Sequence, residues 1–83
     1  MDKNEVIISL FLGREIEFSY KGKAYFLTPN HSKECCYFLE VEQVKGKWEK
    51  IFTGKIDEIL NFKFEDKHSL RDHFKEFKID YIL

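Results

Sequence analysis

The stretch that decides the fold is 14-REIEFSY-20, in which polar and apolar side chains alternate strictly after the first residue. The apolar positions are Ile16, Phe18 and Tyr20. The polar positions between them are Glu15, Glu17 and Ser19. Side chains of an extended chain point to opposite faces with a period of two residues, so this pattern predicts a half-buried β-strand.

Next to this strand lies the first of two Lys-Gly-Lys triplets, at 21–23 and 45–47. Strand-like segments flank the triplets, at 14–20, 24–28, 36–44 and 48–53. Glycine permits the positive φ of a tight turn, and lysines at the corner discourage edge-to-edge pairing. A phosphate-binding loop would need several glycines before a helix and Ser or Thr after the lysine, which neither triplet has. The sequence therefore predicts two hairpins that form a four-stranded antiparallel β-meander.

Three segments have the pattern of helices. Residues 4–13 run from an N-cap residue type to Gly13, although their β-branched residues leave a strand as the alternative. The apolar face of this helix would consist of Val6, Ile7, Leu10 and Phe11. Residues 55–61 have apolar side chains at i, i+3 and i+4, and residues 69–78 begin with a capping serine. Residues 79–83 alternate only partly and fit a terminal strand or a docked tail.

Together these elements predict an α+β fold in which the N-terminal helix and two C-terminal helices pack on one face of the sheet. The chain of 83 residues has room for one core, so we expect a single domain over 1–83. The predicted core side of the sheet consists of Ile16, Phe18, Leu39 and Val41. The predicted helical side of the core consists of Leu10, Ile59, Leu60, Leu70 and Phe74.

Charge and hydropathy exclude some classes of partner. The 14 basic and 15 acidic residues are spread over both halves of the chain, which disfavours nucleic acid. The alternative is weak nucleic-acid binding by the C-terminal helix through Lys63, Lys67, Arg71, Lys75 and Lys78. No apolar run approaches the ~20 residues of a membrane span, and no secretory signal pattern is present. We therefore expect a cytoplasmic protein without a membrane partner.

The face of the sheet opposite the core is predicted to be acidic. Its polar positions are Glu15, Glu17, Ser19, Glu40 and Glu42, and Phe38 and Val44 share their parity. Such a strip is either a solvated sheet face or a docking surface for a basic partner, because carboxylates beside exposed aromatic rings combine steering charge with area to bury. The residues predicted to bind protein are Glu15, Glu17, Phe38, Glu40, Glu42 and Trp48.

The fourth strand does not fit a regular alternation. Trp48 and Phe52 share one parity, whereas Ile51 lies on the other. One apolar set must then be exposed or covered. A homodimer contact, a partner site, a β-bulge or a different register would each explain this.

Few residues have the spacing of a catalytic or metal site. Cys35 and Cys36 are adjacent, so their side chains would point to opposite faces of a strand, and we expect both to be reduced, at least one as a small core residue. His31 with one cysteine does not complete a metal site. On a helix, His68 and His73 would lie on different faces. A Cys–His nucleophile pair with either histidine stays open, because such partners need only be neighbours in space.

The pair Glu65 and Asp66 is interpreted as part of a solvated loop. It does not have the features of a general acid/base pair. We expect no catalytic residue, no metal ligand and no cofactor.

Three stretches resemble a group of small uncharacterised proteins of low-GC Gram-positive bacteria. They are residues 13–25 after an N-terminal helix, residues 56–60, and 67-KHSLRD-72. The resemblance covers most of the chain and implies a source in these bacteria and an α+β fold. It assigns no site residues.

The sequence therefore predicts a non-enzymatic protein-binding or regulatory module, with a protein partner or a homodimer. The first alternative is a small thiol-dependent enzyme or sensor that uses Cys35 or Cys36. The second is the nucleic-acid binder described above.

Overall fold

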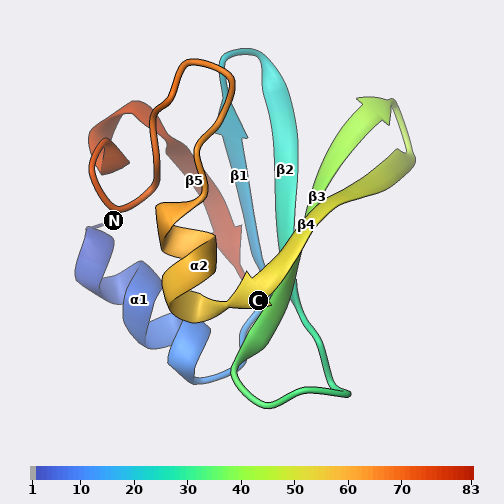
Figure 1. Cartoon of the computed structure of the whole chain (residues 1–83). Coiled ribbons are helices and arrows are strands. Elements are labelled where there is room, and N and C mark those ends of the chain that lie inside the picture. The colour runs from blue at the N-terminus through green and yellow to red at the C-terminus, as the bar shows by residue number, and fades with distance from the viewer. Residues whose placement is uncertain (1) are drawn as a thin grey trace.

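The computed structural model describes residues 2–83. Its elements are α1 (Lys3–Phe11), β1 (Ile16–Tyr20), β2 (Lys23–Pro29), β3 (Cys36–Val44), β4 (Lys47–Lys55), α2 (Ile56–Asn61), the 3₁₀ turn η1 (Phe74–Glu76) and β5 (Lys78–Ile82). The strands form one antiparallel sheet in the order β4-β3-β2-β1-β5. Both α-helices lie on the same side of this sheet (Figure 1). The predicted α+β class is confirmed, and we call the other side of the sheet the open face.

The two Lys-Gly-Lys triplets form hairpin corners, as predicted. Tyr20 pairs with Lys23 across the first corner, and Val44 pairs with Lys47 across the second. Gly22 and Gly46 have φ values of +79° and +83°, in the left-handed region that glycine adopts without a Cβ clash. The two glycine turns therefore place β1 next to β2 and β3 next to β4.

The prediction of a C-terminal helix over 69–78 is wrong. The capping pattern is real, because Ser69 Oγ accepts the backbone N–H of Asp72 at 3.2 Å, but it starts only a turn. The chain then forms η1 and continues as β5 along the edge of β1, with Ile82 opposite Ile16. An uncovered strand edge has a row of unpaired N–H and C=O groups, and pairing there outweighs the helical pattern. The predicted four-stranded meander thus gains a fifth strand, which is the terminal-strand alternative for residues 79–83, and only one α-helix follows β4 where two were predicted.

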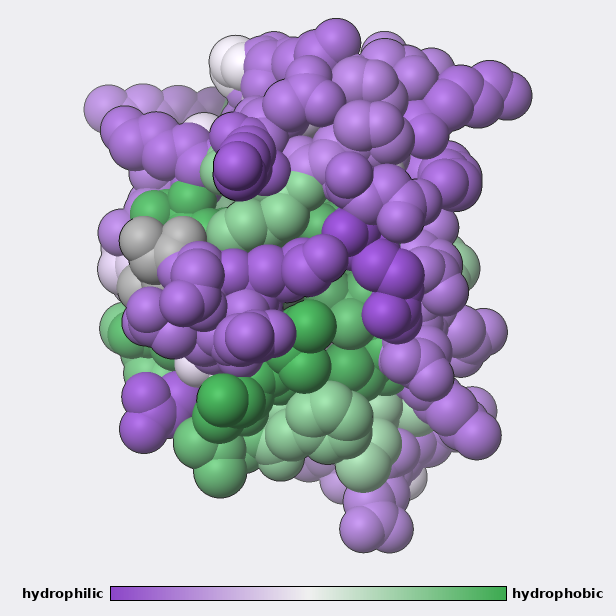
Figure 2. Space-filling view, turned by 90° about the vertical axis from the view of Figure 1, so that its left-hand side faces the viewer, coloured by the Kyte–Doolittle hydropathy of each residue, from purple (hydrophilic) through white to green (hydrophobic). Residues whose placement is uncertain are grey.

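The N-cap of helix α1 lies two residues earlier than predicted. Asp2, where Asn4 was expected, caps the helix, and its Oδ1 accepts the N–H of Glu5 at 2.9 Å. Val6 and Leu10 face the core, but Phe11 is 66% exposed, against the prediction. The helix is short and its buried face narrow, so its far side exposes apolar side chains, namely Ile8, Phe11 and Leu12. Figure 2 shows an apolar area on the lower half of the molecular side where α1 lies.

The core is rich in aromatic rings. Phe18 is fully buried and stacks on Tyr25 with 5.2 Å between ring centroids. The rings of Phe64 and Phe77 pack edge to face with the ring of Phe18, with 6.2 and 5.9 Å between ring centroids. The predicted core residues are buried, namely Leu10, Ile16, Phe18, Leu39, Val41, Ile59, Leu60 and Leu70. Phe74, also predicted, is only half-buried.

A bulge in β4 explains its irregular pattern. Leu39 pairs with Phe52, but the next residue, Glu40, pairs with Lys50, so Ile51 is an extra residue without a partner. The extra residue reverses the parity of the strand. Phe52 therefore faces the core, where its ring lies 5.0 Å from that of Phe62, and Lys50 faces the opposite side.

No helix of the described residues has both the length and the apolar character that crossing a membrane requires.

Candidate functional site

One cross-strand row runs over the whole open face. From β5 to β4 it consists of Tyr81, Glu17, Phe26, Glu40 and Lys50, each paired with the next. Neighbouring strands are about 4.8 Å apart, so Glu17 and Glu40 flank the Phe26 ring at a separation of roughly 10 Å. We call these five residues the carboxylate–aromatic row.

Aromatic rings widen the row on both sides. Trp48 lies 5.8 Å from Phe26 between ring centroids and remains 37% exposed. Phe38 lies beneath the ammonium group of Lys50, with 4.1 Å from Nζ to the ring centroid. Cations are attracted to aromatic faces at this distance. The open face thus already holds one cation on one of its rings.

The carboxylates of the open face differ in the groups that they contact. Glu42 accepts the backbone N–H of Gly46 at 2.8 Å, which stabilises the β3–β4 corner. Glu40 accepts the hydroxyl of Thr28 at 3.2 Å. Glu17 lies opposite Tyr81, whose pKa is raised by partial desolvation and by the charge of Glu17. Glu42 is held at the corner, whereas Glu17 and Glu40 pair directly with Phe26. Glu17 and Glu40 are therefore the carboxylates best placed to meet a partner beside Phe26.

The predicted binding residues occupy the open face, with Glu15 at its margin. Glu15 precedes β1 and lies outside the row, and its backbone oxygen accepts the N–H of Leu83 at 2.8 Å. The sequence analysis missed Phe26, Lys50 and Tyr81. Phe26 could have been found from the parity of residues 24–28, whereas the other two depend on the bulge and on β5.

A second polar cluster lies where the β1–β2 corner meets the chain after α2. Asp66 accepts the hydroxyl of Tyr20, the ammonium of Lys21 at 2.8 Å and the backbone N–H of His68 at 3.1 Å. Partial burial opposes ionisation of Asp66, but the hydrogen bonds from Lys21 and Tyr20 outweigh it and hold the carboxyl pKa well below its usual range. The interpretation of Asp66 as a solvated loop residue is therefore wrong, because it anchors the loop to β1.

We expect Asp66 to set part of the acid stability of the chain. A carboxyl whose pKa is lowered in the folded state stabilises the fold fully at pH values above its unfolded-state pKa of about 3.9. This stabilisation is lost as the pH falls from there toward the folded-state pKa. Asp66→Asn should therefore lower the urea midpoint at neutral pH, and the two proteins should converge as the pH falls from about 4 toward 2.

Glu34→Gln is the matched control, because it also removes one negative charge, from an exposed loop side chain. Circular dichroism at a series of pH values measures both variants. An equal effect of the two substitutions, or a gap that widens in acid, would contradict the role of Asp66.

The cysteines do not meet a histidine of this cluster. Cys35 is exposed with φ +58°, Cys36 is half-buried, and both are free. Cys36 begins β3 at the same end of the sheet as Ile16 of β1, whereas His68 contacts Tyr20 at the other end of β1. The hypothesis of a nucleophile pair with His68 or His73 is therefore wrong for this structure.

The basic residues proposed for nucleic-acid binding do not share a helix, and three of them have acidic partners. Lys63 pairs with Asp72 at 3.6 Å, and Lys78 lies 3.9 Å from Asp80. The guanidinium of Arg71 pairs with a carboxylate of α2 at 3.1 Å. These pairs offset part of the positive charge that phosphate binding needs.

Comparison of the chain with protein-family models, curated proteins and solved structures finds no match.

Proposed function

We propose that this protein is a small, non-enzymatic, cytoplasmic binding module whose open face receives a basic segment of a protein partner. The observation that supports the proposal is the carboxylate–aromatic row, in which Phe26 lies between Glu17 and Glu40 and beside Trp48. Neither helix covers this side of the sheet (Figure 1).

Charge complementarity favours a basic occupant. The open face has four carboxylates, those of Glu17, Glu40, Glu42 and Asp80, against Lys50 within the row and Lys78 on β5. An excess of one charge steers an oppositely charged partner and repels a surface of like charge. A second copy of this chain on the same face would oppose acids to acids, because the two-fold interface of a dimer uses one patch twice. A basic partner is therefore favoured over self-association.

Arginine fits the row better than lysine. Its planar guanidinium can stack on an aromatic ring while its N–H groups pair with a carboxylate. With Glu17 and Glu40 roughly 10 Å apart, two arginines at i and i+3 of a polyproline II segment match the spacing, since that helix advances about 9.3 Å per three-residue turn.

The proposal is tested with a fluorescein-labelled proline-rich peptide that has two arginines three residues apart. Fluorescence anisotropy measures its affinity for the wild type and for Glu17→Gln/Glu40→Gln. We expect binding at low salt that weakens as salt screens the charges, and a loss of about tenfold or more in the double variant.

The matched control is Glu34→Gln/Glu65→Gln, which makes the same change of net charge at two exposed positions outside the row. It should bind like the wild type, and the peptide with glutamines in place of its arginines should not bind. Equal losses in both double variants, or no binding of the arginine peptide, would overturn the proposal.

Light scattering over a concentration series tests whether a second copy of this chain occupies the open face instead. The proposal expects a monomer at all concentrations. A dimer that Trp48→Ala dissociates would instead assign the open face to self-association.

A further inference from the structure

Three metal-ligand side chains meet in the segment between α2 and β5. One ligand atom from each of His68, His73 and Glu76 lies within 4.8 Å of the other two. The turn that replaces the predicted helix brings the two imidazole rings into parallel contact, with 3.8 Å between their centroids. The expectation that these histidines lie apart is therefore wrong.

His68 Nδ1 is surrounded by oxygen atoms. Glu76 Oε2 lies 3.1 Å away, Asp66 Oδ2 3.3 Å and the hydroxyl oxygen of Tyr20 3.1 Å. Tyr20 donates its own proton to Asp66, so its hydroxyl oxygen and the two carboxylates all present acceptor oxygens to His68 Nδ1. A divalent cation can replace a proton held between an imidazole and a carboxylate, because metal binding uses the deprotonated ligands.

His73 provides an independent sign of a missing partner. Its Nδ1 is buried and has no hydrogen-bond partner among the described residues. Buried polar atoms are rarely left unpaired, because their lost hydration is not compensated. A metal ion bound through this atom would satisfy it.

From this arrangement we propose that His68, His73 and Glu76 bind a divalent transition metal ion of the zinc class. Two imidazole nitrogens and one carboxylate oxygen are ligands that Zn²⁺ accepts, with a fourth position for water or a partner side chain. Asp66 is a positioning residue, because it accepts a hydrogen bond from the backbone of His68 and lies beside its ring.

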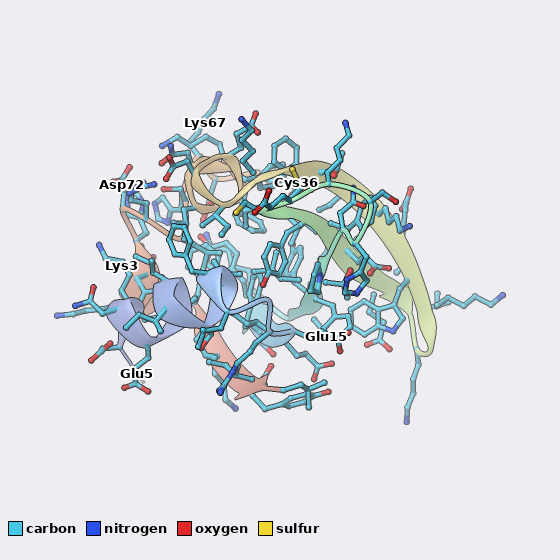
Figure 3. All side chains as sticks on the ribbon, turned by 90° about the horizontal axis from the view of Figure 1, so that it is seen from below. Lys3, Glu5, Glu15, Cys36, Lys67 and Asp72 are labelled. Atoms are coloured by element: carbon cyan, nitrogen blue, oxygen red, sulfur yellow. The ribbon has the colours of Figure 1, made fainter. Side chains whose placement is uncertain are left out.

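The geometry also says which side chain must move. Tetrahedral bonds of about 2.0–2.2 Å place ligand atoms roughly 3.3–3.6 Å apart. His68 Nδ1 and Glu76 Oε2, at 3.1 Å, need to separate only slightly. Parallel stacked rings cannot direct their in-plane lone pairs at one ion, and His73 must therefore turn. An open pocket of about 850 Å³, lined in part by His73 and Glu76, gives its ring room. Figure 3 shows Lys3 and Asp72, which also line this pocket, on neighbouring parts of the fold.

Isothermal titration calorimetry of the full chain with zinc chloride tests the site. We expect one equivalent to bind, with affinity lowered at least about tenfold in His68→Ala, His73→Ala and Glu76→Gln. Cobalt chloride should give the intense visible absorption of a tetrahedral ion, and His31→Ala should leave both results unchanged. The zinc-bound chain should also melt at a higher temperature, because the ion binds the folded state.

Two further variants keep the test decisive. Cys35→Ser/Cys36→Ser must retain binding, since loss there would assign the ion to the thiols. His73→Gln serves if His73→Ala fails to fold in the absence of metal, as judged by circular dichroism. Absence of zinc binding, or binding that survives removal of His68 and His73, would overturn the proposal.

Discussion

Phe18→Ala is expected to lower the free energy of unfolding by about 3–5 kcal/mol, the usual cost of truncating a buried phenylalanine. Domains are stabilised by only about 5–15 kcal/mol, and one of this size lies at the low end, so much of the variant should be unfolded at 37 °C. Phe18 is fully buried and its ring contacts Tyr25, Phe64 and Phe77. Its loss therefore removes the packing between β1 and the chain after α2. Urea denaturation followed by circular dichroism measures the change.

Phe11→Ala is the matched control, because it removes the same atoms from a ring that is 66% exposed. Its expected effect is within about 0.5 kcal/mol. Similar midpoints for the two variants would contradict the aromatic core.

Tyr37→Phe is expected to lower the free energy of unfolding by about 0.5–1.5 kcal/mol, the usual net contribution of a hydrogen bond, because the Leu10 carbonyl keeps the N–H of Gly13 as a donor. Tyr37 is 1% exposed, and its hydroxyl lies 2.9 Å from the carbonyl oxygens of Leu10 and Arg14. It thereby ties β3 to the C-terminal end of α1, where helical carbonyls lack partners within the helix. The substitution keeps the ring and removes only this tie.

Stability measurements at alkaline pH separate the contribution of the Tyr37 hydroxyl from that of its ring. Burial raises the pKa of Tyr37 from 10.0 to about 12. A raised folded-state pKa contributes stability that is complete below the unfolded value and is lost as the pH rises through the folded one. The stability difference between wild type and Tyr37→Phe should therefore be largest below about pH 10 and shrink toward pH 12. A difference that stays constant over this range would contradict the mechanism.

Much of the sheet was predictable because its determinants are local. Alternation in residues 14–20 gives β1, and glycines with positive φ give both hairpin corners. Residues 56–61 also form their helix as expected, because apolar spacing and acids in the first turn act within that segment. Parity within the strands also placed Glu17, Phe38 and Glu40 on the open face.

The rest of the candidate sites depended on contacts between distant segments. Trp48 and Lys50 reach the open face because Ile51 bulges out of β4, and the alternation of the strand alone does not locate that extra residue. Tyr81 joins the row because β5 pairs with β1, and His68 meets His73 because the predicted helix does not form.

The sequence by itself determined four strands, their two hairpins, two helices and most of the core, because side-chain period and turn residues act over a few positions. Only the tertiary structure decided the fate of residues 69–82. A capping serine and helical spacing favour a helix there, but Leu70 and Phe77 are buried in the core and Ile79 packs against it. The open edge of β1 supplies backbone partners for β5. Edge pairing and burial outweigh a local helical preference, because an isolated short helix is marginal in water.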